Sequence, residues 1–136
     1  MVFKPVAAVL RRDPRLGYAL VFGSCARGTP HALSDLDIAI GGLQQPLTAL
    51  ELGDLISRLE QAAGRTVDLV VLDEANPSLA YRIFKDGRVL LERDPAAMAS
   101  RKAQVILEYL DWKPIEDLFA AAGRCKQNTG VTVSHG

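Results

Sequence analysis

YALVFGS at residues 18–24 and SDLDIAI at residues 34–40 decide the fold of this chain. The first is a continuous apolar run of strand length that ends at Gly23-Ser24, which predicts a buried strand running into a tight turn. In the second, residues 36–40 predict another short strand, closed by Gly41 and Gly42. Both strands are short and apolar, so we expect them inside a sheet that is covered by helices.

The surrounding sequence completes an α/β (α+β) domain. We expect a mixed four-stranded sheet flanked by helices, because helical and strand patterns alternate along the chain. The elements expected are helices at 5–13, 47–63 and 78–86, strands at 66–72 and 88–92, and a helical stretch at 95–122 broken at Pro114. The expected organisation is a core at 1–94, a C-terminal helical extension at 95–122 and a loosely ordered tail at 123–136.

Composition narrows the class of protein. The 136 residues fit one domain, and 49% hydrophobic with 24% charged residues is ordinary for a soluble globular chain. The formal net charge is zero, which argues against direct nucleic-acid binding. Cys25 and Cys125 have neither metal nor disulfide spacing, and no apolar run reaches the length of a membrane span. We therefore expect a cytoplasmic protein without a membrane partner.

The acids of the second stretch carry the chemistry. Side chains on a strand alternate between faces, so Asp35 and Asp37 project together while Leu36 points to the core. Two neighbouring carboxylates repel each other, and this arrangement makes physical sense mainly if a cation lies between them. Oxygen ligands favour Mg²⁺, which proteins commonly hold with one or two carboxylates and the phosphates of a substrate.

A third acid interrupts an apolar strand. Asp68 stands within Thr-Val-Asp-Leu-Val-Val-Leu and alternates with Val67 and Leu69. If this strand pairs beside that of Asp35 and Asp37, all three carboxylates can serve one catalytic centre. Such a set suits two Mg²⁺ ions, one activating the attacking oxygen and one stabilising the leaving pyrophosphate.

The turn after the first strand is the candidate phosphate site. Gly23 lets the backbone approach a ligand closely, and Ser24 can donate its hydroxyl to a phosphate oxygen. Arg27 could place a guanidinium on the same phosphates. A local capping role is the preferred reading of Ser34, and no companion base makes Cys25 a nucleophile.

Residues 21–28 (VFGSCARG) followed by residues 34–40 (SDLDIAI) resemble the signature of the nucleotidyltransferase superfamily related to DNA polymerase β. They are more closely similar to the minimal nucleotidyltransferases that serve as antitoxins beside HEPN-domain toxins. The resemblance covers roughly residues 1–110 and includes the ten-residue gap between Ser24 and Asp35. Residues 76–79 and 87–91 also look like the closing helix and strand of that family.

The resemblance implies an activity and a partner. Such antitoxins transfer AMP from ATP to a tyrosine of the cognate HEPN ribonuclease toxin and so neutralise it. Carried over by position, Gly23 and Ser24 match the phosphate-binding turn, and Arg27 matches the frequent Ala-Arg-Gly. The metal ligands and catalytic acids are matched by Asp35, Asp37 and Asp68. Cys25 stands where larger or basic residues often occur, so the details of phosphate contact differ.

Two other functions remain open from the sequence. A binding antitoxin could mask its partner without chemistry, but three intact acids speak against a decayed site. Transfer to a small molecule such as an aminoglycoside would usually need an additional helical domain. For the protein acceptor, we expect residues 98–119 to supply a docking surface, because they are more apolar than one small sheet needs. Packing of these residues on their own domain is the equal alternative.

Overall fold

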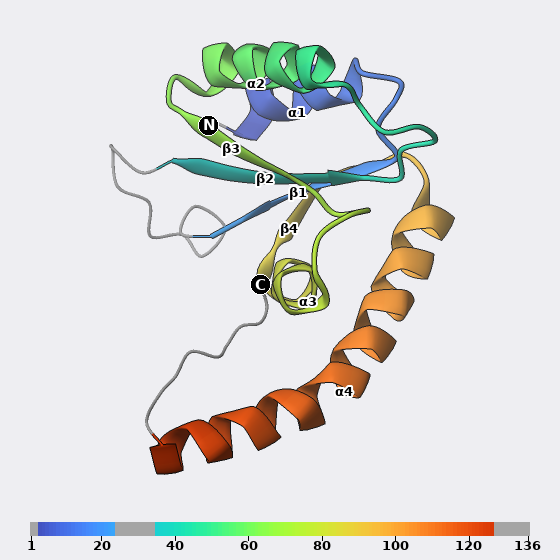
Figure 1. The fold of residues 1–136 in the computed structure, drawn as a ribbon. Coiled ribbons are helices and arrows are strands. Elements are labelled where there is room, and N and C mark those ends of the chain that lie inside the picture. The colour runs from blue at the N-terminus through green and yellow to red at the C-terminus, as the bar shows by residue number, and fades with distance from the viewer. Residues whose placement is uncertain (1–2, 24–34, 127–136) are drawn as a thin grey trace.

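The computed structural model describes residues 3–23 and 35–126, with side chains as far as residue 111. The described chain contains four helices and four strands (Figure 1). They are α1 (Phe3–Arg11), β1 (Tyr18–Phe22), β2 (Leu36–Gly41), α2 (Ala49–Ala63), β3 (Val67–Val71), α3 (Pro77–Asp86), β4 (Arg88–Glu92) and α4 (Pro95–Lys126). Every element expected from the sequence is present.

The strands form one mixed sheet in the order β3-β2-β1-β4. Strand β1 is antiparallel to both β2 and β4, whereas β2 and β3 run parallel. The parallel pair is connected by α2, as a parallel connection requires a crossover. This topology brings the end of β1 and the starts of β2 and β3 to one end of the sheet, and the expected mixed sheet is confirmed.

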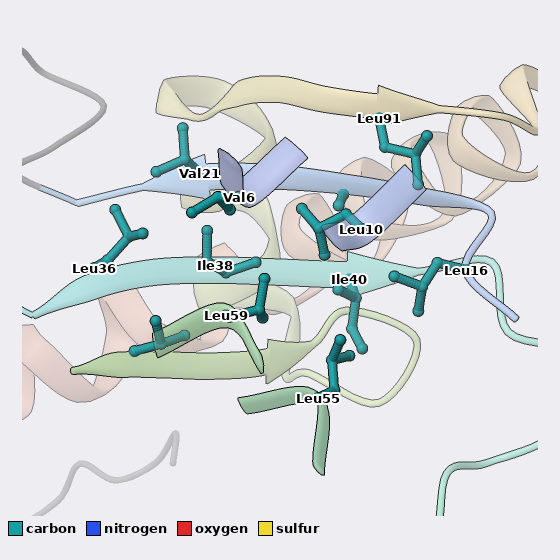
Figure 2. Packing of buried hydrophobic residues seen from close by; sticks show 12 residues of the cluster. Val6, Leu10, Leu16, Val21, Leu36, Ile38, Ile40, Leu55, Leu59 and Leu91 are labelled. Carbon is teal, nitrogen blue, oxygen red and sulfur yellow. The ribbon is translucent and has the colours of Figure 1, made fainter. Parts of the chain in front are cut away.

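Helices α1 and α2 cover one face of the sheet. Leu36, Ile38 and Ile40 of β2 all point to this side, where they are fully buried (Figure 2). Full burial of one such side chain stabilises a fold by about 1.5–3 kcal/mol. The helices contribute Val6, Leu10, Leu55 and Leu59 to the same cluster. The alternation in β2 is therefore fixed by a dry core on one side.

Helices α3 and α4 cover the opposite face. Their buried residues Ala80, Ile83 and Val105 pack with Leu20 of β1 and Ala39 of β2. Arg101 also fastens α4 to the loop after β3, because its guanidinium donates to the carbonyls of Leu72 and Ala75. The first half of α4 is thereby attached to the sheet as a second cover.

Capping residues explain where α2 begins and ends. The helix was expected to begin at residue 47, but Thr48 is its N-cap and forms a capping box with Glu51. The expected stop is confirmed at Gly64, which has a φ of 71° and donates its N–H to the carbonyl of Glu60. Likewise, Asn76 caps α3 in front of a proline at the first helical turn.

Helix α4 corrects one expectation. A break at Pro114 was expected, but the helix continues through this residue to Lys126, beyond the limit of 122. A proline removes one backbone donor and bends a helix without always ending it. Figure 1 shows α4 changing direction along its course. No helix in the described part of the chain is both long and apolar enough to cross a membrane.

Candidate active site

Asp35 and Asp37 lie at the start of β2, on the face opposite the α1 and α2 core. Leu36 and Ile38, their neighbours in sequence, are fully buried in that core, whereas Asp37 is half-buried and Asp35 is exposed. Strand alternation therefore sends both carboxylates to the side that carries α3 and α4. The structure thus places Asp37 on the face opposite Leu36, with Asp35 directly before the strand.

Asp68 lies beside Asp37 on the neighbouring strand. The parallel register of β2 and β3 places Asp37 directly opposite Asp68, and Asp35 precedes the pair of Leu36 with Val67. Val67 is buried on the α1 and α2 side, so Asp68 points to the other face and is exposed. The condition set by the sequence, that the strand of Asp68 pairs beside that of Asp37, is met.

The backbone of Gly23 closes against Asp37. Gly23 follows β1 with a φ of 76°, and a Cβ built at this position would lie 2.2 Å from Oδ2 of Asp37. Only glycine fits such a close approach at a positive φ. Phe22, the preceding residue, pairs with Asp37 across the antiparallel ladder. The backbone at the end of β1 thus lies directly against the Asp37 carboxylate, with no side chain between them.

The three acids do not form a compact cluster. Asp37 and Asp68 lie side by side in one row across the sheet, and Asp35 lies in the next row on the same face. Among the side chains that the structure describes, in residues 3–23 and 35–111, no three His, Cys, Asp or Glu are grouped so as to hold a metal ion. Neighbouring strands lie about 4.8 Å apart, whereas alternate residues along one strand are separated by about 6.6 Å. Asp37 with Asp68 is therefore the closer pair, and Asp35 is one row further toward the end of the sheet.

These residues fit a magnesium site that is completed by a substrate. Asp37 and Asp68 offer hard oxygen donors from adjacent strands at an end of the sheet where both are accessible. Mg²⁺ is commonly bound by one or two carboxylates together with substrate phosphates, and it rarely has an all-protein cage. Two paired carboxylates beside a glycine backbone match this description.

Asp35 has a partner that the sequence interpretation missed. The hydroxyl of Thr66 donates a short hydrogen bond to Oδ1 of Asp35. From the sequence, Thr66 is expected only as the first residue of the strand at 66–72. Its spacing was the available signal. Thr66 and Asp68 are two residues apart and so share a face of their strand, as Asp35 and Asp37 do.

Two predicted phosphate ligands, Ser24 and Arg27, lie outside the described residues.

Among the residues expected to form a docking surface, some are packed against the domain and others are exposed. Met98 and Val105 pack on the domain, and Tyr109 stacks on Tyr81 of α3 at a centroid distance of 4.2 Å. In contrast, Ile106, Leu107 and Leu110 are 38%, 64% and 58% exposed. The side chains of Trp112, Ile115, Leu118 and Phe119 are not among those described.

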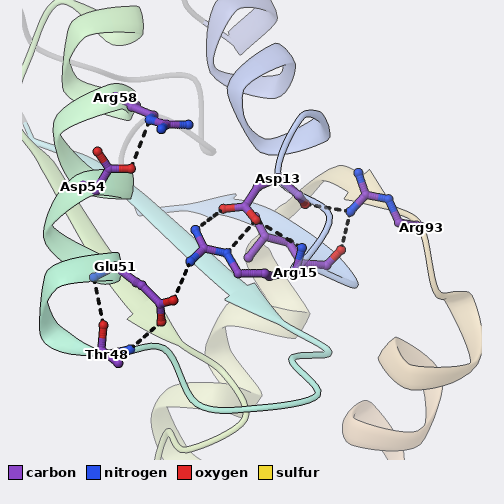
Figure 3. Close-up of polar contacts among 8 residues, drawn as sticks. Asp13, Arg15, Thr48, Glu51, Asp54, Arg58 and Arg93 are labelled. Carbon is purple, nitrogen blue, oxygen red and sulfur yellow. Dashed lines mark hydrogen bonds and ion pairs between the residues drawn. The ribbon is translucent and has the colours of Figure 1, made fainter.

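A second polar cluster lies at the opposite end of β1 and β2. Arg15 donates to Asp13 at 2.7 Å and pairs with Glu51 at 3.3 Å (Figure 3). Arg93 donates to the backbone carbonyls of Asp13, Leu16 and Arg11. These contacts join α1, α2 and β4 through their loops. No sequence motif marks this cluster, because its members are dispersed along the chain.

The charges of this cluster are satisfied within the protein. The hydrogen bond from Arg15 holds the pKa of Asp13 below its usual value of 3.8, and the Thr48 N–H lowers the pKa of Glu51. A hollow of about 510 Å³ lies here and is lined in part by Gly17, Leu47 and Arg93. Because both arginines already have protein partners, we interpret this region as a structural joint and not as an anion site.

Comparisons with known proteins agree with the fold. The family model for polymerase beta, nucleotidyltransferase matches residues 4–96, from α1 to the start of α4. The protein adenylyltransferase MntA of Aphanizomenon flos-aquae is 26% identical over 117 residues, which are 79% of this chain and 78% of that protein. MntA of Shewanella oneidensis is 35% identical over 83 residues, 60% of this chain and 59% of that protein.

Solved structures share this architecture over most of the chain. A crystal structure of a toxin-antitoxin with AMP-PNP matches with a TM-score of 0.78 and 24% identity, covering 90% of this chain and 98% of the other. The MNT antitoxin complex with the tri-AMPylated Shewanella oneidensis HEPN toxin contains a chain that matches with a TM-score of 0.71 and 21% identity, at the same coverage. At these identities, the likeness establishes the fold.

Proposed function

The chain belongs to the polymerase beta nucleotidyltransferase family, and on that premise we propose that it is an antitoxin that transfers AMP from ATP to a HEPN-type toxin. The acceptor is a hydroxyl group, that of a tyrosine, and modification neutralises the toxin. The names of the relatives support this activity, since both are protein adenylyltransferases. We also propose a cytoplasmic location for the protein.

One observation carries the proposal. Asp37 faces Asp68 across two parallel strands, and Gly23 brings bare backbone against Asp37 at the same end of the sheet. Nucleotidyl transfer needs such a place, where carboxylates can hold a cation and a triphosphate can approach the chain closely. In this proposal Asp35, Asp37 and Asp68 are the catalytic acids, and Ser24 and Arg27 contact the phosphates.

We propose two Mg²⁺ ions as the cofactor. Bound Mg²⁺ would neutralise charge on the triphosphate and on the acceptor oxygen. The protein contributes ligand geometry, because the register of β2 and β3 fixes the separation of Asp37 and Asp68. Asp35, one row further along the same face, completes the set of acidic ligands.

The toxin docks, in this proposal, on the exposed apolar residues of α4. Ile106, Leu107 and Leu110 are exposed on a helix that covers the same face of the sheet as the acids occupy. A partner that binds there approaches the acids without crossing the sheet. Apolar side chains concentrated on one surface are typical of interaction sites. The partner proposed is the HEPN-type toxin itself.

Labelled ATP tests the activity directly. The protein, Mg²⁺ and a HEPN-type toxin are incubated with ATP labelled on either the α- or the γ-phosphate. We expect the toxin to acquire the α label and not the γ label, and intact-mass analysis to show whole AMP units. The Asp37→Asn variant should transfer no label. Toxin that is inhibited equally by this variant, without any label from the wild type, would instead identify a masking antitoxin.

A further inference from the structure

Thr66 is held in place from two sides. Its carbonyl accepts a hydrogen bond from the N–H of Leu36 at 2.9 Å, which continues the parallel ladder one residue before β3 begins. The next N–H, that of Val67, donates to Oε2 of Glu60 at 3.0 Å. Glu60 belongs to the last turn of α2 and its carbonyl also accepts the N–H of the Gly64 cap. The end of α2 therefore fixes the backbone that carries Thr66.

The fixed hydroxyl of Thr66 engages one oxygen of Asp35. It donates to Oδ1, so Oδ2 is the oxygen that this bond leaves for a cation. A hydrogen bond to an ionised carboxylate is shorter and stronger than a neutral one and orients the group. Groups that hydrogen-bond to a metal ligand commonly set its orientation, and their loss weakens metal binding by about 10–100-fold.

We propose that Thr66 is a positioning residue for the metal site, holding Asp35 so that Oδ2 is presented to a cation. This inference rests on the proposed function. Asp35 and Thr66 are both exposed, so water competes for their hydrogen bond and it adds little to folding. The effect of losing it therefore falls on metal affinity and not on stability.

The test compares Thr66→Val, which keeps the shape and removes the hydroxyl, with Thr66→Ser, which keeps the hydroxyl. Mn²⁺ is titrated into each protein in the presence of AMP-PNP and followed by electron paramagnetic resonance. We expect the Thr66→Val variant to bind Mn²⁺ about 10–100-fold more weakly, with an unchanged Tm. Thr66→Ser should restore binding close to that of the wild type.

Steady-state transfer gives a second readout. In Thr66→Val the Mg²⁺ concentration needed for half-maximal rate should rise, while kcat at saturating Mg²⁺ stays close to the wild-type value. Unchanged Mn²⁺ affinity in Thr66→Val, or equal weakening in Thr66→Ser, would overturn the inference. If the wild type binds Mn²⁺ with AMP-PNP but transfers no AMP, the proposed function fails while the titration still decides the role of Thr66.

Discussion

Asp37 of β2 lies directly opposite Asp68 of β3 in the parallel register. Adjacent strands are about 4.8 Å apart, and like charges placed opposite each other destabilise a sheet. Packing of Val67 and Ile38 in the core keeps the register fixed despite this repulsion. The fold thus maintains a concentration of negative charge that a bound cation would relieve.

Replacing one acid should separate stability from activity. Asp68→Asn removes the repulsion, so we expect unfolding in urea with EDTA to require about 0.2–1 kcal/mol more free energy than in the wild type. Added Mg²⁺ should stabilise the wild type and erase this advantage. AMP transfer should fall at least about 100-fold, because a cation contributes several kcal/mol to such a transition state. A variant less stable than the wild type in EDTA would show that Asp68 is structural.

Gly23 and Gly64 form a matched pair for testing the close approach at the site. Both have a positive φ, but a Cβ at Gly64 meets no atom within 4 Å, whereas at Gly23 it meets Asp37. Gly64→Ala should cost only the strain of a left-handed residue, about 1–2 kcal/mol, with full AMP transfer. Gly23→Ala should lose transfer as well as stability. Equal activity of the two variants, measured with α-labelled ATP, would refute the steric argument.

The docking surface is tested with exposed leucines. Leu107→Asp and Leu110→Asp should weaken binding of the HEPN-type toxin without lowering Tm, because both side chains are more than half exposed. Leu50→Asp is the control, since Leu50 is 87% exposed on α2, a helix that covers the opposite face. Calorimetric titration with the toxin should distinguish them. Weakening by Leu50→Asp alone would move the interface to α2.

Acid should weaken the Asp13–Arg15 contact. The pKa of Asp13 is lowered in the folded protein, so its carboxylate stabilises the fold above its usual pKa of 3.8 and loses this effect as the pH falls through the folded value. Asp13→Asn should lower the free energy of unfolding by about 1–2 kcal/mol at pH 7. This difference should shrink below about pH 4. Arg15 keeps Glu51 as a partner in the variant, and a difference that does not vary with pH would contradict the assignment.

Local patterns predicted the elements of this fold well. The strand of Tyr18–Phe22 and that of Arg88–Glu92 were expected at their observed limits, because apolar runs and glycines mark both. The position of Asp37 on the face opposite Leu36 followed from alternation alone. The family relationship and the fold were likewise predicted, since the spacing of glycine, serine and aspartates is read directly from the chain.

Contacts between distant segments could not be predicted in this way. The hydrogen bond from Thr66 to Asp35 depends on the register of β2 with β3, which the sequence of either strand does not specify. Arg93 binds carbonyls of the loop after α1, and backbone acceptors have no sequence signature. Helix α4 continues through Pro114, although a proline within a helical pattern usually marks a break.

In β2 and β3, whether a residue number is odd or even decides which face of the sheet its side chain occupies. Asp35, Asp37, Thr66 and Asp68 each have the parity that faces α3 and α4 on their strand, and the other parity of both strands fills the core beneath α1 and α2. Inserting one residue between Thr66 and Asp68 would turn the acid into that core, where an unpaired carboxylate is costly. Inserting two would return it to the open face. The position of the acids therefore depends on the two-residue repeat of side-chain direction, which the pleat of the sheet sets.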